Sequence, residues 1–397
     1  MGFAMPVQYY GPKGYILRSG HEGVLSRGLP LVEPTEPSIA APHEQLFIRT
    51  HQAMEIWFDQ MNDELEYART VLSQPRVEEA QVSDVARHVA RCTAIAALLT
   101  EHMGVLETLS SIDFFDFRQN LFGAAGFDSF RFREFEWLAG LIDGGYLTYA
   151  NERAPHFAGG DEFRATVERY QQFWHRRMES VVDPSTALLK GRDRSLSDAS
   201  LRALILTWLS RTPYPDPAGG APSPAYRDAF VARFRSRFEE AFRRDLEQAR
   251  GADPGGPGAG RSAHDDADVA QALARLDWFV SSPARCAMLF ILQYAHLPLL
   301  TWPKELLEGV LTLDQGIITW RGRHIEMVSH VLGGGRLSTG GQKGSGLSYL
   351  RQTMLLRVFP ETSDARSFLL GHREAAGLFD ARSWQPFQLG SSVSESL

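Results

Sequence analysis

The spacing of apolar residues predicts a chain built from helices. Between about His43 and Leu72, large side chains recur every three or four positions, as they do on the buried face of a helix. The inward positions are Phe47, His51, Met54, Phe58, Met61 and Leu65. The same period runs from about Val82 to Leu109, and no stretch shows the alternation of a half-buried strand. The pattern therefore predicts an all-α fold.

Later segments with helical spacing extend this picture over most of the chain. Ser110 or Ser111 is placed to cap a helix in the aromatic-rich segment that follows Leu109. The other predicted helices are Phe163–Val182, Ser197–Leu209, Tyr226–Arg250, Asp268–His296, Lys304–Leu332 and Leu347–Val358.

Three segments lack this spacing. Residues 1–42 are rich in turn-forming residues, and residues 251–266 are rich in Gly, Pro and Ala with almost no large apolar side chains. Such an insertion cannot bury enough surface to offset its ordering entropy, so we expect it to be disordered. We expect the serine-rich tail, 390–397, to be frayed. The sequence thus predicts an irregular N-terminal segment and one helical domain over residues 43–389.

Composition and charge narrow the class of protein. Of the 397 residues, 44% are hydrophobic and 22% charged, and a net charge of −7 gives no reason to expect nucleic acid or an anionic membrane as a partner. Two cysteines, Cys92 and Cys286, are too few for a disulfide scaffold or a cysteine metal site, and they favour a reducing compartment. The N-terminus lacks the apolar run of a signal peptide, and no stretch approaches the roughly 18 apolar residues of a membrane span. We therefore expect a cytoplasmic protein.

Two pairs of residues, each one helical turn apart, are candidates for chemistry. Phe47 and His51 place an aromatic ring and an imidazole on one helix face, where the histidine is either a satisfied core residue or part of a reaction site. Phe114 and Arg118 repeat the spacing, and an arginine on so aromatic a face needs a partner. That partner is either a nearby aspartate of the chain or the carboxylate or phosphate of a ligand.

Two further features lie near the C-terminus. His324 shares an apolar stripe with Trp320, Val328 and Val331, so it is either a core histidine or a ligand of a metal or haem. The glycine-dense loop around Thr339 lacks the spacing of a phosphate-binding loop, and a mobile lid rich in backbone N–H donors is the better interpretation.

Five blocks in this order resemble one family, tryptophan 2,3-dioxygenase, within the wider haem dioxygenase superfamily. The blocks are LFIRTHQAMEIWF, LSSIDFFDFRQNLFGAAGFDSFRFRE, TWLSRTP, WRGRHIEMVSHVLG and STGGQKGSGLSYLR. The resemblance implies an all-α haem-binding bundle of that type. It also implies a non-covalent haem b with Fe(II), and O2 as co-substrate.

The same resemblance implies a role for each matching residue. His324 matches the histidine that ligates the haem iron, and Trp320 lies in the same cofactor-binding block. His51 matches the distal histidine, which hydrogen-bonds the indole N–H. The other matches bind substrate: Arg118 as carboxylate clamp, Thr339 at the amino-acid head group, and Phe47 and Phe114 in the pocket wall. Tyr10 and Tyr15 match an N-terminal element that reaches into a neighbouring subunit of a homotetramer.

The expected reaction is O2-dependent cleavage of the indole C2–C3 bond of L-tryptophan or a close indole amino acid, giving N-formylkynurenine. Insertion of one oxygen atom, with an oxindole-type product, is the alternative within the superfamily, because some relatives in secondary metabolism react in that way. A different subgroup, the haem tyrosine hydroxylases, carries a cysteine four residues after the haem histidine. This chain has Val328 at that position, which argues against that subgroup. An alternative of another class is a helical interaction protein without catalytic activity.

Overall fold

The computed structural model describes residues 42–118, 129–142, 144–181, 199–216, 218, 220–251, 263–333 and 346–378. Within these ranges the chain forms helices and a single isolated β-bridge, between Tyr214 and Ser223, which confirms the predicted all-α fold. The longer helices are α2 (Pro42–Leu72), α3 (Glu79–Leu106), α4 (Ser111–Arg118), α5 (Phe130–Ala139), α6 (Gly144–Arg153), α7 (Gly160–Val181), α9 (Leu201–Leu209), α10 (Arg227–Gly251), α11 (Ala263–Ser281), α12 (Pro283–Gln293), α13 (Thr301–Leu332) and α14 (Gly346–Thr353). The short ones are η3 (Pro224–Tyr226), η4 (Pro298–Leu300), α15 (Pro360–Ala365), η5 (Arg366–Phe368) and α16 (His372–Ala375).

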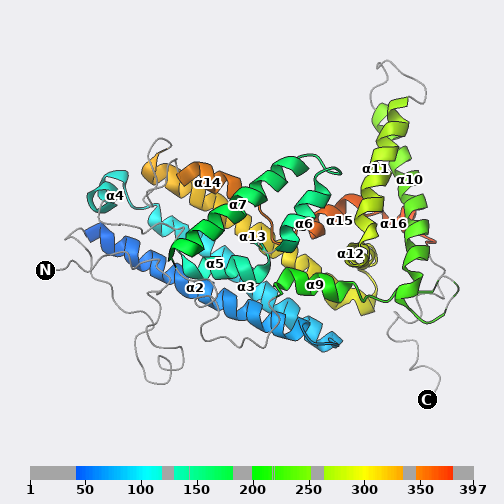
Figure 1. Cartoon of the computed structure of the whole chain (residues 1–397), viewed down its shortest axis with the longest axis horizontal. Helices are drawn as coiled ribbons and strands as arrows, with labels where there is room; N and C mark the ends of the chain where they lie inside the picture. Colours follow the sequence, from blue (N-terminus) through cyan, green and yellow to red (C-terminus); the bar gives the residue numbers. More distant parts are fainter. Residues whose placement is uncertain are drawn as a thin grey trace.

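Helix α3 is the centre of the bundle, because it packs against both α2 and α13 (Figure 1). Glycines of α13 allow a close approach on one side: a Cβ added at Gly316 would lie 3.2 Å from the Cβ of Ala96. Helix α3 is also long and apolar enough to cross a membrane by length and composition alone. The sequence predicts no stretch that approaches a membrane span, and α3 differs from that prediction by these two measures. The apolar stripe of α3 is buried against its two neighbours.

Helix α2 has the buried stripe that its sequence predicts. Met54, Phe58, Met61 and Leu65 are buried in the main core. Phe47 and His51, at the N-terminal end of the same stripe, keep some solvent-accessible surface. The apolar face of α2 is therefore fully buried over its middle and only partly buried at its N-terminal end, where Phe47 packs against the core.

The prediction of a single helix over Asp268–His296 is wrong. The structure breaks it at Ser282 into α11 and α12, because Pro283 has no N–H to donate and disfavours helical geometry in the residue before it. Helix α11 begins at Ala263, inside the range predicted as a disordered insertion, and residues 252–262 of that range lie outside the described residues.

The last predicted helix, Leu347–Val358, is shorter in the structure and ends at Thr353. The backbone N–H groups of Val358 and Phe359 donate to the buried carboxylate of Asp314 on α13 instead of continuing a helix. This side chain satisfies donors that an irregular buried segment would otherwise leave unpaired.

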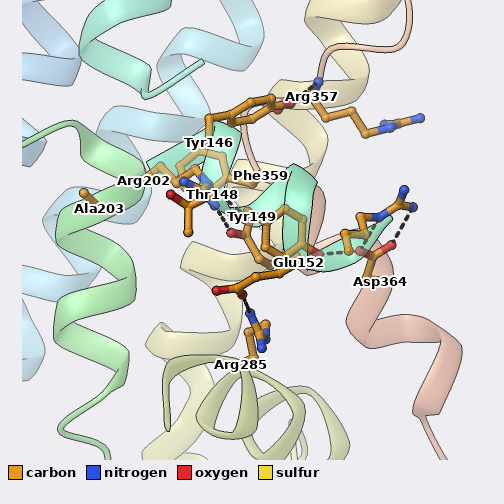
Figure 2. A network of polar contacts seen from close by, with 12 residues as sticks. Tyr146, Thr148, Tyr149, Glu152, Arg202, Ala203, Arg285, Arg357, Phe359 and Asp364 are labelled. Carbon is orange, nitrogen blue, oxygen red and sulfur yellow. Dashed lines mark hydrogen bonds and ion pairs between the residues drawn. The ribbon is translucent and has the colours of Figure 1, made fainter. Parts of the chain in front are cut away.

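Helix α6, which the sequence pattern did not predict, is fixed by polar contacts with the C-terminal segment (Figure 2). The hydroxyl of Tyr146 donates to the carbonyl of Arg357 and accepts from its N–H. Tyr149 and Arg153 both donate to Asp364 of α15. These contacts bind α6 and the chain around α15 into one unit.

The two ends of the molecule differ. Helices α10 and α11 pack on each other and project from one end (Figure 1). At the other end lie α4, the start of α2, and the C-terminal part of α13 with α14 (Figure 1). The predicted site residues on α2, α4 and α13 all lie toward this second end.

Candidate active site

His51 lies on α2 and is held in one orientation by its own helix. Its Nδ1 lies 2.7 Å from the carbonyl oxygen of Phe47. Because a carbonyl can only accept, Nδ1 carries the proton and Nε2 is the acceptor nitrogen of the neutral ring. Burial lowers the pKa of His51 to about 4, against the smaller opposing effect of the hydrogen bond to Phe47. The imidazole is therefore neutral at pH 7.

Three phenylalanines form an aromatic wall beside His51. The Phe47 ring lies 4.2 Å from the His51 ring, and 5.7 and 5.6 Å from those of Phe114 and Phe117, measured between centroids. Phe114 and Phe117 lie on α4. Ser110 caps the N-terminus of this helix, as predicted, because its hydroxyl accepts a hydrogen bond from the N–H of Asp113. The aromatic wall therefore joins α2 to α4, and its Phe47 ring packs beside the imidazole of His51.

His324 approaches the same region from α13. Burial lowers the pKa of His324 to about 4, so this imidazole is also neutral at pH 7. The two histidines are close enough that a positive charge on His324 would lower the pKa of His51 further. Each ring keeps some accessible surface although protein surrounds it on most sides. This combination is expected of side chains that line an internal cavity.

The surroundings of His324 test whether a haem fits here. The Trp320 ring lies 5.8 Å from that of His324 and packs on Phe132 and Phe58 at 4.9 and 5.6 Å. The indole Nε1 of Trp320 is buried and has no hydrogen-bond partner among the described residues. A neutral imidazole, an apolar aromatic lining and a buried N–H donor that lacks an acceptor fit a planar apolar cofactor with a polar edge.

Arg118 is the last residue of α4, next to the aromatic wall, and is partly buried. The aspartates that the sequence offers as partners of Arg118 are Asp113 and Asp116, and the carboxylate of Asp113 contacts Ser110 and His43. Arg49, between Phe47 and His51 in sequence, is exposed, so its charge lies away from the buried face of α2.

Some predicted site residues cannot be compared with the structure. Thr339 and the glycine loop around it, and Tyr10 and Tyr15 in the N-terminal segment, lie outside the described residues. His51, Phe47, Phe114, Arg118, Trp320 and His324 lie at one end of the bundle.

The sequence pattern did not identify Glu55, one turn beyond His51 on α2. The Ser129 hydroxyl donates to its carboxyl group, and Ser129 is the N-cap of α5. Burial raises the pKa of Glu55 to about 7. Glu55 thus ties α2 to the start of the helix that presents Phe132 to Trp320. The sequence feature that could have identified Glu55 is its position four residues after His51, on the buried and otherwise mostly apolar face of α2.

These features define a class: an all-α protein in which two buried, neutral histidines from different helices lie near enough to interact electrostatically, each with aromatic side chains packed beside it. Residues 34–184 match the sequence model of the family described as tryptophan 2,3-dioxygenase. Tryptophan 2,3-dioxygenase 2 of Ralstonia nicotianae is 34% identical over 344 residues, which cover 82% of this chain and 85% of that protein. Tryptophan 2,3-dioxygenase of Sorangium cellulosum is 33% identical over 346 residues, covering 82% of this chain and 76% of that protein. The chain belongs to the tryptophan 2,3-dioxygenase family.

Proposed function

We propose that the protein is a haem-dependent dioxygenase that cleaves the C2–C3 bond of the indole ring of L-tryptophan and forms N-formylkynurenine. The observation that carries the proposal is a pair of buried, neutral histidines on different helices that interact electrostatically, with Phe47 packed on the ring of His51 and Trp320 packed on the ring of His324. Family membership over most of the chain supports the same reaction.

His51 orients the substrate ring. Its Nε2 is the acceptor nitrogen, because Nδ1 donates to the Phe47 carbonyl, and the N–H of an indole is the donor that matches it. Phe47 and Phe114 pack on the faces of a flat aromatic ring. One polar contact and an aromatic wall fix the position of the indole and its rotation in its own plane.

His324 supplies the nitrogen ligand for a non-covalent haem b. Its low pKa keeps the lone pair available at neutral pH, so binding iron does not compete with a proton. The buried Trp320 N–H, which has no acceptor among the described residues, would donate to a polar group of the cofactor. When bound, ferrous haem supplies the activation of dioxygen.

The remaining roles concern the amino-acid head group. Arg118, at the end of the aromatic helix, clamps the substrate carboxylate, and Thr339 of the glycine loop contacts the ammonium and carboxylate groups. The protein assembles as a homotetramer, in which Tyr10 and Tyr15 of one subunit contribute to the substrate pocket of a neighbouring subunit. We expect it to act in the cytoplasm. A bidentate arginine–carboxylate contact in a dry pocket discriminates against amines that lack the carboxylate.

Turnover of L-tryptophan under heavy-isotope dioxygen tests the reaction. We expect two labelled oxygen atoms in N-formylkynurenine, measured by mass spectrometry. One labelled atom in an oxindole-type product would contradict ring cleavage. Purified protein without a Soret band after supplementation with haem would contradict the cofactor assignment and favour a helical interaction protein without catalytic activity.

The carboxylate clamp has a separate test. Arg118→Ala should raise the KM for L-tryptophan steeply and leave the Soret band of the bound haem unchanged. Unaltered kinetics with L-tryptophan would show that Arg118 does not bind the carboxylate. The matched control is Arg49→Ala on the neighbouring helix, because Arg49 is exposed and should not affect KM.

A further inference from the structure

His324 has no hydrogen bond that fixes the direction of its ring within the described part of the chain. Burial alone accounts for its lowered pKa. Histidines that bind metals usually donate their second ring N–H to a carboxylate or carbonyl, which sets the angle of the ring. Trp320, one turn earlier, contacts the ring through packing. The rotation of α13 about its own axis therefore decides where the imidazole points.

Arg321, three residues before His324, fixes α13 at this turn. Its guanidinium is buried, with 3% of the residue exposed. Nη1 donates to the carbonyl oxygens of Thr353 and Leu356, at 3.0 Å each. Nη2 donates to the carboxylate of Glu136 on α5, at 3.1 Å. One rigid planar group thus connects α13 to α5 and to the end of α14.

The carboxylate that receives Arg321 is itself held in place. Glu136 accepts from the guanidinium of Arg133, one turn earlier on α5, and from the hydroxyl of Tyr170 on α7. Arg133 also donates to the Tyr170 hydroxyl. Each of these side chains is buried. Glu136 therefore cannot follow a rotation of α13 without breaking a network that would remain buried.

The carbonyl acceptors are equally fixed, because the chain after α14 is bound at successive residues. The Tyr146 hydroxyl contacts both the N–H and the carbonyl of Arg357 (Figure 2). Asp314, on α13 itself, receives the next two N–H groups, those of Val358 and Phe359, so this second contact ties the stretch to α13. The carbonyls of Thr353 and Leu356 lie just before this anchored stretch. Arg321 is thus held by Glu136 of α5 and by carbonyls of a segment that Tyr146 binds to α6, and neither α5 nor α6 is part of α13.

We propose that Arg321 is a positioning residue: it locks the rotation of α13 and thereby the direction of the His324 imidazole. The proposal rests on the proposed function, in which that imidazole binds the haem iron. Residues three apart on a helix lie on the same side of neighbouring turns, so a rotation released at Arg321 reaches His324 directly. Outer partners of metal ligands typically change metal affinity about 10- to 100-fold, which is the effect expected here on haem affinity.

The test compares haem-loaded wild type with Arg321→Met and Arg321→Lys. The readouts are the iron–histidine stretching band of the ferrous protein by resonance Raman and the rate of haem transfer to apomyoglobin. We expect Arg321→Met to shift or broaden the band and to release haem about 10- to 100-fold faster. Lys keeps the charge but not the fork that spans three acceptors, so Arg321→Lys should give a smaller change in the same direction.

Arg323→Gln is the matched control. Arg323 precedes His324 on the same helix, but it is exposed and pairs with Glu107. It should leave the band and the haem release unchanged. A purely structural role of Arg321 would lower the melting temperature and leave the iron–histidine band as in wild type.

A wild-type band and release rate in Arg321→Met would overturn the proposal. If that variant does not fold, the same result in Arg321→Lys overturns it. Failure of the proposed function is distinguishable, because wild type would then show no iron–histidine band, or His324→Ala would retain it.

Discussion

The tautomer and low pKa of His51 predict how activity depends on pH. The pKa of His51 falls from 6.5 to about 4, which corresponds to about 3 kcal/mol in favour of the neutral ring. At pH 7 roughly one molecule in a thousand is protonated there. The perturbation is a change of pH from 8 to 4.5, with kcat/KM for L-tryptophan measured in wild type and in His51→Ala. We expect no inflection near pH 6.5 that depends on His51.

The direction of the pH effect on kcat/KM follows from the fact that only the neutral form of His51 has a ring nitrogen that can accept a hydrogen bond. Below pH 4 to 5 the protonated ring has no acceptor nitrogen for the indole N–H, so the contribution of His51 should decline only there. In the neutral range, His51→Ala should lower kcat/KM about fivefold, since one hydrogen bond is worth roughly 1 kcal/mol. With 1-methyl-L-tryptophan, which has no indole N–H, the wild-type advantage should largely disappear.

His51→Ala controls for other titrating groups, because ionisation of the substrate or of other side chains changes kcat/KM in the variant and in wild type alike. Circular dichroism at each pH excludes unfolding as the cause of a change. An inflection near pH 6.5 in wild type that is absent from His51→Ala would refute the reasoning, because His51 would then titrate as an exposed histidine does.

Two other predictions concern the cofactor and the buried ion pairs. His324→Ala should abolish haem retention, measured from the Soret absorbance after gel filtration, and added imidazole should restore part of it. Arg202→Met leaves the buried carboxylate of Glu361 without the arginine that pairs with it, which should lower the free energy of unfolding by about 3 to 5 kcal/mol in urea titrations. A loss below about 1 kcal/mol, as for a surface pair, would contradict the second prediction.

The sequence predicted features whose signal is local. A helical period of apolar residues is enough to place Phe47 and His51 on one face of α2, and Phe114 on an inner face of α4. The same period cannot show that His51 and His324 lie near each other, because α2 and α13 are far apart in the sequence. The five family-like blocks supplied that relation, since their roles come from one shared pocket.

The features that the pattern missed depend on tertiary contacts. Helix α6 starts with two glycines, which are poor helix formers, and the contacts of Tyr146 and Tyr149 with the C-terminal segment compensate. The shortened α14 likewise follows from the position of Asp314 on another helix. Glu136 and Arg321 look like surface charges in sequence, and only the packing of α5 against α13 buries them as a pair.

The spacing between α2, which carries His51, and α13, which carries His324, depends on α3, because both helices pack on it. Gly316 of α13 lies where a Cβ would be 3.2 Å from Ala96 of α3, and about eight residues, roughly 12 Å, before His324. Gly316→Val should therefore push α13 away from α3, lower the free energy of unfolding by about 1 to 3 kcal/mol, and reduce kcat/KM by displacing His324 from His51.

The matched control for this prediction is Gly104→Val on α3, where an added Cβ meets nothing within 4 Å. Both variants place the same β-branched side chain in a helix, so the intrinsic cost of valine is the same. Urea titrations and steady-state kinetics of the two should differ in both quantities. If Gly316→Val loses stability but keeps wild-type kcat/KM, the spacing between α3 and α13 does not set the width of the pocket. Packing at the centre of the bundle would then be independent of the chemistry at its end.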